Sequence, residues 1–326
     1  MRRAGAVGLG LAVLSAATFG TSGSFADSLM SSGWTPGGAV TARVGAAALL
    51  LTIPALIQLR GRWSLLRRSL AAVVAYGLVA VAGCQFFFFN AVEHLSVGVA
   101  LLLEYSGTLL VVLWMWLRHS QRPRRLTILG GLLAIGGLVL VLDLSGTQRV
   151  DLVGVLWGLG AAAGLAVFFV LSAGTDDLVP PMVMAWAGMV IGALALLVFG
   201  LVGAIPFAAS TADVHFAGHR TNWLVPVIGL SLVAAVIAYT AGIAAARRLG
   251  ARVASFVGLA EVLFAILFAW LLLGQRPSAL QALGGVVVLA GIALVRADDR
   301  QPSGGSSDPV TAAALDQREI PLPATP

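Results

Sequence analysis

Residues 95–141 read LSVGVALLLEYSGTLLVVLWMWLRHSQRPRRLTILGGLLAIGGLVLV, and residues 249–295 read LGARVASFVGLAEVLFAILFAWLLLGQRPSALQALGGVVVLAGIALV. At this spacing of 154 positions, 17 of the 47 aligned pairs are identical. In each copy a hydrophobic run ends in Trp-Leu, a Gln-Arg-Pro turn follows, and a second hydrophobic run contains Gly-Gly. Because a membrane-spanning helix needs about 20 mostly apolar residues, each copy is long enough for two spans. The chain is therefore expected to contain a duplicated membrane segment.

Composition places this chain in a lipid bilayer rather than in water. Hydrophobic residues make up 59% of its 326 residues and charged residues only 10%, whereas soluble domains carry roughly 25% charge. The net charge of +6 rests on arginine alone, and most arginines lie in short loops between apolar runs; this argues against a nucleic-acid-binding face. The single cysteine, Cys84, lies inside an apolar run. It excludes an intramolecular disulfide and argues against a metal-thiolate site.

Ten apolar runs are predicted to be membrane-spanning helices, so the expected fold class is an all-α membrane protein. The runs cover approximately residues 5–26, 36–59, 69–90, 96–118, 126–143, 152–172, 180–204, 223–247, 250–273 and 278–296. Residues 1–148 hold the first five spans and residues 149–296 the second five, which we interpret as two repeats. Residues 297–326 contain Pro, Ser, Gly, Asp and Arg with little apolar patterning, and are predicted to be a disordered cytoplasmic tail.

The first span begins like a cleavable signal peptide, but we expect it to be retained. Met1-Arg2-Arg3 is a basic start, and Ser24-Phe25-Ala26 ends in small residues. The apolar run, however, exceeds the roughly 7–15 residues of a signal-peptide core. Its removal would also leave unequal numbers of spans in the two halves.

The distribution of arginines predicts that both termini are cytoplasmic, in a cell inner (plasma) membrane. In this orientation the inner loops and ends carry Arg2, Arg3, Arg60, Arg62, Arg67, Arg68, Arg118, Arg122, Arg124, Arg125, Arg247, Arg248, Arg252, Arg296 and Arg300. The outer loops carry only Arg149, Arg220 and Arg276. This bias follows the positive-inside rule, although the inner loop with Asp176-Asp177 has no arginine beside it. Since five spans per half is an odd number, the second half is expected to be inverted, as in many secondary transporters.

Ionisable residues within membrane spans are costly, so each is a candidate for function. At a rise of about 1.5 Å per residue, Arg43 lies about 10 Å and Glu104 about 12 Å from the outer starts of their spans. Because these depths match, Arg43 is predicted to receive a substrate carboxylate, and Glu104 to hold an amine, a proton or Arg43 itself. The alternatives are a fixed ion pair, or an Arg43 side chain that extends to the outer interface.

Glu261 lies about 15 Å into the ninth span, near the membrane midplane. One interpretation is that its carboxyl group carries a proton during transport. The alternative is a neutral carboxylic acid that joins two helices by a hydrogen bond. In the repeat alignment Glu261 falls opposite Gly107 rather than Glu104. The two halves are therefore expected to differ at the centre of the membrane.

Neighbouring spans supply further polar side chains that can complete a cavity. Gln85, Asn90 and Tyr105 are predicted to bind substrate together with Arg43 and Glu104. Additional candidates are Tyr76, Tyr239 and Thr240.

The sequence gives no indication of a cofactor or of catalysis. His215 and His219 lie in a predicted loop, where their spacing imposes no common face for a metal. We find no Gly-Lys-Ser/Thr phosphate-binding signature and no nucleophile–base motif. No metal, cofactor or enzymatic activity is therefore expected.

The second half of the chain resembles a known family. Residues 254–276 read ASFVGLAEVLFAILFAWLLLGQR, which is similar to the drug/metabolite transporter superfamily, specifically the EamA-type ten-helix exporters. The resemblance covers residues 5–296. Family members often read Leu-Glu-Pro-Val around the position of Glu261, followed by Gly-Glu. Here Val262 stands in place of the proline and Gln275 in place of the second glutamate.

The first half resembles the threonine/homoserine exporter branch of that family. The branch has a Thr-Ala-Leu-Arg segment, comparable to Thr41-Ala42-Arg43, which is one residue shorter. It also has Ala-Leu-Glu-Phe-Thr-Gly-Pro, where this chain has Leu102-Leu103-Glu104-Tyr105-Ser106-Gly107-Thr108. Because Thr108 stands where the branch has proline, a proline-induced helix break does not carry over. The resemblance implies export of amino acids or related metabolites, within a superfamily that also handles drugs and nucleotide sugars.

We therefore predict a secondary transporter that exports amino acids or related small metabolites across the cytoplasmic membrane by alternating access. The expected partners are a small-molecule substrate, protons and membrane lipid, and no nucleic acid. One alternative is a multidrug or other metabolite transporter. Another is a non-transporting membrane scaffold or sensor, which would tolerate neutral replacement of all three intramembrane charges.

Overall fold

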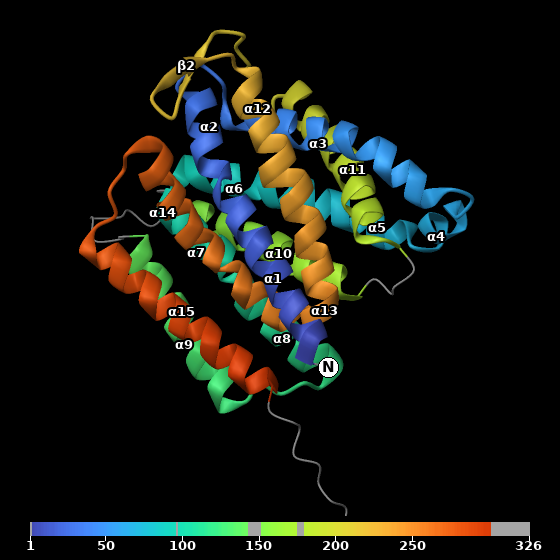
Figure 1. Ribbon diagram of the computed structural model, residues 1–326, viewed down its shortest axis with the longest axis vertical. Helices are drawn as coiled ribbons and strands as arrows, with labels where there is room; N and C mark the ends of the chain where they lie inside the picture. Colours follow the sequence, from blue (N-terminus) through green and yellow to red (C-terminus); the bar gives the residue numbers. More distant parts are fainter. Residues whose placement is uncertain (1, 96, 143–150, 175–178, 301–326) are drawn as a thin grey trace, which may run out of the picture.

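The computed structural model describes residues 2–95, 97–142, 151–174 and 179–300. In these residues the chain forms a bundle of long helices, with one short β-hairpin at the end of the bundle drawn uppermost in Figure 1. The helices before residue 143 are α1 (Arg2–Gly20), α2 (Ser22–Met30), α3 (Pro36–Leu59), α4 (Trp63–Arg68), α5 (Leu70–Ala75), the π-helix η1 (Tyr76–Gly83), α6 (Cys84–His94), α7 (Val97–Tyr105), α8 (Gly107–His119) and α9 (Arg125–Val141). The elements after residue 150 are α10 (Leu152–Gly174), α11 (Pro181–Leu201), the strands β1 (Val214–Phe216) and β2 (His219–Thr221), α12 (Leu224–Ser231), the π-helix η2 (Leu232–Ile237), α13 (Ala238–Gly258), α14 (Ala260–Leu273) and α15 (Ala279–Arg300).

Eight helical segments among the described residues are long and apolar enough to cross a membrane, against ten predicted spans. Two causes explain the difference. The helices α9 and α14 are apolar but shorter than a full span. The helix α14 is only the second part of the predicted ninth span, because the first part, residues 250–258, is continuous with the eighth span in the segment Leu224–Gly258. Inside it Gly250 has φ 77° and ψ 159°, a conformation that glycine adopts without steric cost, so two helices meet there.

Two predicted spans each consist of two helices separated by one turn residue, whose hydroxyl group bonds to the backbone of the preceding helix. The Thr21 hydroxyl, between α1 and α2, donates to the carbonyl of Thr18 at 2.7 Å. The Ser106 hydroxyl, between α7 and α8, donates to the carbonyl of Leu103. Such bonds compete with the regular helical ladder and bend helices. Each pair of helices still forms one membrane-length segment, Gly5–Met30 and Val97–His119, as predicted for residues 5–26 and 96–118.

The third and eighth spans each contain a π-helical segment, η1 and η2. A π-helix widens the backbone turn and is often found at functional sites. Both segments lie near the middle of their spans, next to helices that line the central cavity described below.

The two copies of the repeat fold alike where α8 and α14 end. Ser120 and Gly274, which are 154 positions apart, both adopt left-handed backbone conformations, with φ 53° and 73°. The amides of the next residues, Gln121 and Gln275, donate to the carbonyls of Met115 and Ala269, both at 3.2 Å. The repeated Gln-Arg-Pro motif therefore follows the same helix cap in each half.

Helices α9 and α15 pack side by side through glycines, at one edge of the bundle in Figure 1. A Cβ atom at Gly130 would lie 2.7 Å from the carbonyl oxygen of Gly291, and one at Gly137 would lie 2.8 Å from that of Gly284. Small residues permit such close approach in membranes, where lipid supplies no hydrophobic drive to helix association. The contacts are reciprocal, because Gly130 aligns with Gly284 in the repeat and Gly137 with Gly291.

A second pair of contacts has the same reciprocity. Gly8 of α1 packs against Arg248 and Leu249, and Gly154 of α10 packs against His94 and Leu95. The contacted residues again lie 154 positions apart. The first helix of each half, α1 or α10, therefore packs against corresponding residues of the opposite half.

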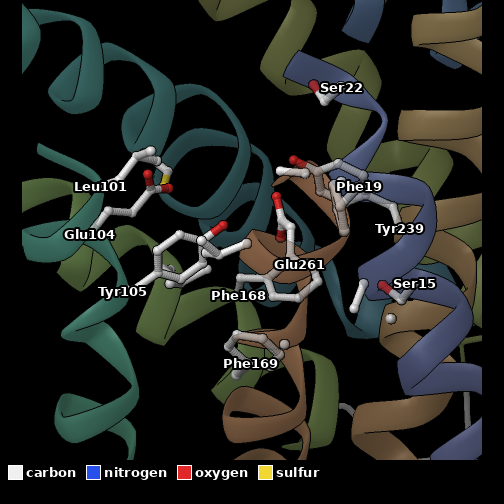
Figure 2. A pocket seen from close by; sticks show the side chains of 18 of the residues that line it. Ser15, Phe19, Ser22, Leu101, Glu104, Tyr105, Phe168, Phe169, Tyr239 and Glu261 are labelled. Carbon is white, nitrogen blue, oxygen red and sulfur yellow. The ribbon is translucent and has the colours of Figure 1, made fainter. Parts of the chain in front are cut away.

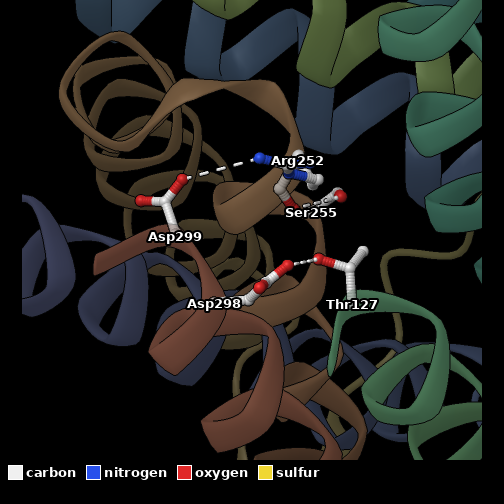
Figure 3. A network of polar contacts seen from close by, with 5 residues as sticks. All are labelled: Thr127, Arg252, Ser255, Asp298 and Asp299. Atoms are coloured by element: carbon white, nitrogen blue, oxygen red, sulfur yellow. Dashed lines mark hydrogen bonds and ion pairs between the residues drawn. The ribbon is translucent and has the colours of Figure 1, made fainter. Parts of the chain in front are cut away.

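A polar network joins α9, α13 and α15 at the end of the bundle near Asp298 (Figure 3). The Thr127 hydroxyl donates to the carboxylate of Asp298, which is buried. Arg252 pairs with Asp299 at 3.8 Å, and the Ser255 hydroxyl donates to the carbonyl of Arg252 at 2.8 Å. Because α15 continues to Arg300, residues 297–300 are helical rather than part of the predicted tail. Residues 301–326 and the predicted boundary between the repeats at residues 148–149 lie outside the described residues.

The hairpin is an exception to the all-α expectation. Strands β1 and β2 pair antiparallel, with His215 opposite Arg220. Arg220 forms an ion pair with Asp213 at 3.1 Å, and the ring of Phe216 stacks on Phe25 of α2 at 5.0 Å. The hairpin therefore rests on the end of the bundle formed by α2.

The contact between α9 and α15 gives a matched test of glycine packing. A Cβ at Gly137 would lie 2.6 Å from the backbone nitrogen of Val288, whereas Gly136, the preceding residue, has nothing within 4 Å. Gly137→Ala is expected to lower stability by about 1–3 kcal/mol, since overpacking forces the helices apart. Gly136→Ala is expected to be neutral or to stabilise by up to about 1 kcal/mol through helix propensity. Thermal unfolding of both purified variants measures this, and equal stabilities would contradict the packing described here.

Candidate functional site

A cavity of about 330 Å³ lies in the centre of the bundle. Helices from both halves form its wall, namely α1, α2, α3, η1, α6 and α7 from the first and α10, α13 and α14 from the second. Six aromatic side chains line it: Phe19, Phe88, Tyr105, Phe168, Phe169 and Tyr239. The same wall contains one arginine and two glutamates, Arg43, Glu104 and Glu261. The three intramembrane charges singled out in the sequence therefore meet in one cavity.

Glu104 is held by the only cysteine of the chain. The thiol of Cys84, at the start of α6, donates to Oε1 of Glu104 with a sulfur–oxygen distance of 3.3 Å. The same sulfur lies 3.5 Å from the carbonyl oxygen of Ala161 on α10. Glu104 occupies the last turn of α7, just before the break at Ser106. The carboxyl group is thus fixed by a neutral partner and retains acceptor capacity towards the cavity.

Glu261 lies on the other side of the cavity, in the first turn of α14. The amide of Val262 bonds to the carbonyl of Leu259 at 3.2 Å, which marks the start of this helix. The Tyr105 and Glu261 side chains both line the cavity, and Figure 2 shows both directed into the same space. Tyr105 follows Glu104 in the chain and lines the same cavity as Glu261.

Arg43 is buried, with only 7% of its surface exposed. Its guanidinium donates to the Ser22 hydroxyl at 3.1 Å and to the carbonyl of Ala234 in η2. It also lies over the ring of Phe19, 5.6 Å from the centroid, a cation–π geometry. Its Nε has no hydrogen-bond partner. The Arg43 side chain therefore points into the protein and not to the outer interface. Its Nε–H group is available as a further hydrogen-bond donor.

Arg43 and Glu104 form no direct ion pair within the described residues. Each is held by neutral groups on other helices. Of the alternatives considered from the sequence, a fixed Arg43–Glu104 pair is therefore not what the structure contains. Separate charges of opposite sign leave both groups able to bind a ligand between them.

The other predicted site residues divide into two groups. Gln85 and Tyr105 line the cavity, whereas Asn90 is not among its lining residues. The Asn90 amide donates to the carbonyl of Phe86 in its own helix at 2.7 Å. A role for Asn90 in substrate binding stays a prediction, with no support from this geometry.

Several lining residues escaped the sequence analysis. Ser22 and Phe19 lie where α1 gives way to α2, and Phe168 and Phe169 lie on α10. A signal for the first pair existed in Gly20-Thr21-Ser22-Gly23, a run of small residues in the middle of an apolar span. Nothing in the sequence distinguished Phe168 and Phe169 from packing residues. Among the described residues no group of three or more His, Cys, Asp or Glu side chains is arranged to hold a metal.

The two halves of the chain each match one and the same family. The description of that family is EamA-like transporter family, and the matches cover residues 6–143 and 152–297. The chain belongs to the EamA-like transporter family. A solved crystal structure has the same fold, with a TM-score of 0.71 at 21% sequence identity over 92% of this chain and 99% of that chain. No curated protein matches the chain.

Membership defines the broad activity of this EamA-like transporter. It is a multi-pass integral membrane protein that moves small molecules across a membrane. The cavity, which both matched segments line, is the place in the described structure where such a molecule can be enclosed.

The contacts of Arg43 can be tested by a change that keeps its charge. Lysine lacks the planar fork of donors, so Arg43→Lys cannot hold Ser22, Ala234 and the Phe19 ring together. We expect a loss of about 1.5–3 kcal/mol, the range for one hydrogen bond to a charged group. Arg220→Lys, in the exposed hairpin, is the matched control and should change stability by less than about 0.5 kcal/mol. Equal thermal unfolding of the two purified variants would show that the Arg43 contacts contribute nothing.

Proposed function

We propose that this protein is a secondary transporter that exports amino acids or related small metabolites by alternating access, closest to the threonine/homoserine exporter branch. The observation that carries the proposal is the presence of one guanidinium and two carboxyl groups in one aromatic-lined cavity. A free amino acid carries a carboxylate and an ammonium group. Arg43 suits the first, and Glu104 or Glu261 suits the second.

The size of the cavity favours a small substrate. Ligand pockets usually measure about 300–1,000 Å³, so a cavity of about 330 Å³ is at the small end of that range. The aromatic rings can cover the apolar part of such a substrate. Gln85 and Tyr105 add neutral hydrogen-bonding groups to the same wall.

Ten spans in two inverted five-helix repeats form the framework of this proposal. The reciprocal contacts of Gly130 with Gly291 and of Gly137 with Gly284 support it. A two-fold axis relates each of these contacts to the other, because Gly130 corresponds to Gly284 and Gly137 to Gly291. The axis of antiparallel helices such as α9 and α15 lies in the membrane plane, as in inverted-repeat transporters. The break at Gly250 supports counting Leu224–Gly258 as parts of two spans.

Orientation and energy coupling complete the proposal. The excess of arginine in the predicted inner loops supports cytoplasmic termini in the inner membrane. Glu261 is the proposed proton carrier, because its carboxyl group lines the cavity near the middle of the span and forms no ion pair among the described residues. A proton and a substrate amine would then use neighbouring carboxyl groups.

One alternative has specific support. Six aromatic side chains and two carboxyl groups also suit an apolar organic cation, so a multidrug or other metabolite transporter is the second candidate function. It differs from the first in needing no role for Arg43 in substrate recognition. A scaffold or sensor without transport has no observation in its favour beyond those that all membrane bundles share.

A flux assay in proteoliposomes tests the function directly. A panel of radiolabelled amino acids is added to vesicles containing the purified protein, with and without a pH gradient. Uptake of at least one amino acid above empty vesicles, and stimulation by the gradient, is the expected result. If organic cations move and every amino acid fails, the second candidate replaces the first. If nothing in either class moves, transport of these substrates is excluded.

Glu104→Gln tests the proposed substrate site within the same assay. The carboxamide oxygen can still accept the Cys84 hydrogen bond, so folding should be preserved, but the negative charge that holds an amine is lost. We expect flux to fall to the level of empty vesicles while the thermal unfolding midpoint stays close to that of the parent protein. Glu93→Gln, at the exposed end of α6, is the control and should transport normally. Full flux in Glu104→Gln would remove Glu104 from the site.

A further inference from the structure

A groove of about 390 Å³ lies on the surface of the bundle between α8 and α10 and is separate from the central cavity. We call it the α8–α10 groove. Every residue that lines it is apolar, and α8 contributes Leu110, Leu113, Trp114 and Leu117. This spacing of three and four residues places the four side chains on one face of the helix. Because Leu113, Trp114 and Leu117 are 44%, 46% and 73% exposed, the groove opens to the surroundings of the bundle.

The groove forms because α8 and α10 touch at one end and are separated by short side chains further on. Gly107, the first residue of α8, packs so closely that a Cβ there would collide with the carbonyl oxygen of Ala162 on α10. Beyond this contact α10 presents Ala163 and Ala166 to the groove. Small residues on a membrane helix usually admit a neighbouring helix. Here only α8 and α10 line the space, so it is left for a molecule from the membrane.

The groove extends through about half of the membrane, from its middle to the ends of α8 and α10. Leu110 lies nine residues before the end of α8, and Ala163 lies eleven residues before the end of α10. These separations correspond to about 13 Å and 16 Å along the helices, and one leaflet supplies about 15 Å of the hydrocarbon core. Leu117 and Leu171, at the other end of the groove, are two and three residues from the helix ends. The depth and the apolar lining suit one acyl chain of a phospholipid.

Positive charge lies where the groove reaches the end of α8. Arg118 follows Leu117 and lies one helical turn after Trp114, so it is placed at the mouth of the groove. Arg122 and Arg125 follow in the next seven residues. All three arginines are exposed, and within the described part of the chain none of them forms an ion pair. Basic groups at the cytoplasmic ends of membrane helices attract anionic lipid headgroups.

The equivalent surface in the other copy of the repeat is closed. Phe264 of α14 aligns with Leu110 of α8. Gly20 of α1 corresponds to Ala166 of α10, by the reciprocal contacts of these two helices described above. A Cβ at Gly20 would lie 2.6 Å from that of Phe264. The helices α1 and α14 therefore meet directly at the place where α8 and α10 leave space.

The arginines are reduced in the same copy. Leu272 and Ala279 align with Arg118 and Arg125, and Arg276 is the one arginine that the second copy keeps in this segment. An open groove and a cluster of positive charge thus occur together in one copy and are both diminished in the other. This joint occurrence is expected if a single ligand with an apolar part and an anionic part uses both.

A second copy of this chain is a poorer occupant of the groove. A dimer with a two-fold axis along the membrane normal brings the same surface of both copies together. Arg118 and Arg122 would then lie close to their own counterparts, and like charges placed side by side oppose association. A phospholipid with an anionic headgroup supplies the opposite charge together with the apolar chain.

We propose that the α8–α10 groove binds one acyl chain of an anionic phospholipid, whose headgroup lies against Arg118 and Arg122. The assignment to the inner leaflet rests on the orientation given under the proposed function, whereas the groove and its arginines do not depend on that orientation. The same stretch of α10 lines the groove with Val167 and Val170 and the cavity with Phe168 and Phe169. A bound lipid therefore supports the cavity wall from the outside.

Titration of the purified full-length protein in detergent tests the site. Phosphatidylglycerol, phosphatidylcholine with the same acyl chains, and glycerol phosphate are added separately while the thermal unfolding midpoint is recorded. A ligand of the folded state raises this midpoint as its concentration passes Kd. We expect a saturable rise with phosphatidylglycerol, about tenfold weaker binding of phosphatidylcholine because it lacks the net charge that two arginines attract, and no rise with glycerol phosphate. Equal binding of the two lipids, or an equal rise with glycerol phosphate, would contradict the proposal.

Two pairs of variants separate the groove from general effects of lipid. Ala163→Leu fills the groove and should abolish the saturable rise, whereas Ala290→Leu, the same change at an exposed alanine of α15, should keep it. Arg118→Gln should weaken phosphatidylglycerol binding about fivefold, and Arg62→Gln, at an exposed arginine between α3 and α4, should leave it unchanged. If Ala163→Leu does not fold, the arginine pair still decides. Equal binding by the two members of either pair overturns the site.

Light scattering of the same samples identifies the competing occupant. If the purified protein is a dimer that Ala163→Leu converts to a monomer, and phosphatidylglycerol leaves the unfolding midpoint unchanged, the groove is an interface between copies and the proposal is wrong. None of these measurements needs flux. Failure of the lipid site is therefore distinguishable from failure of the proposed transport function.

Discussion

The structure depends on one constraint, which is that charge inside a membrane must be compensated without water. Arg43 and Glu104 meet it with neutral partners. Arg43 uses a hydroxyl, a carbonyl and an aromatic ring. Glu104 uses a thiol, and Glu261 lines the same cavity as the phenol of Tyr105. These partners come from helices other than the one that carries the charge, so the same contacts also hold the bundle together around the cavity.

Neutral compensation has a functional advantage over a salt bridge. A buried ion pair is strongly destabilised when one partner is taken away, so a ligand that displaced it would face a large penalty. Hydrogen bonds from neutral groups leave the charge itself uncancelled. In an EamA-like transporter this arrangement keeps positive and negative groups in one cavity and separately able to bind. The broken helices and π-helical segments place backbone and side-chain groups where straight helices would not.

The sequence predicted the framework and the charged centre better than it predicted local backbone geometry. The repeat spacing indicated a Gln-Arg-Pro turn after each of two matching hydrophobic runs, and the structure has matching helix caps directly before these turns, at Ser120 and Gly274. Arg43, Glu104 and Glu261 were found because charge in a hydrophobic run is conspicuous, and all three line the cavity. Asn90 was selected by the same reasoning, but an amide can bond to its own helix, and it does.

Other features had no sequence signal of the kind used. Hydropathy treats Thr21 and Ser106 as tolerated polar residues, although each is the single turn residue between two helices of its span. The π-helices leave composition unchanged, so only the backbone reveals them. The interaction of Cys84 with Glu104 joins residues on different helices. It depends on a packing geometry that no spacing rule encodes.

The Cys84–Glu104 contact gives this protein a built-in spectroscopic reporter. The chain has a single cysteine, and its sulfur lies 3.3 Å from a carboxyl oxygen of Glu104 in the wall of the cavity. Thiol stretching vibrations absorb in a window of the infrared spectrum that is free of other protein bands, and their frequency follows hydrogen-bond strength. A carboxylate is a stronger acceptor than a protonated carboxyl group. The native protein, unlabelled, thus records the charge state of its central glutamate in the vibration of one bond.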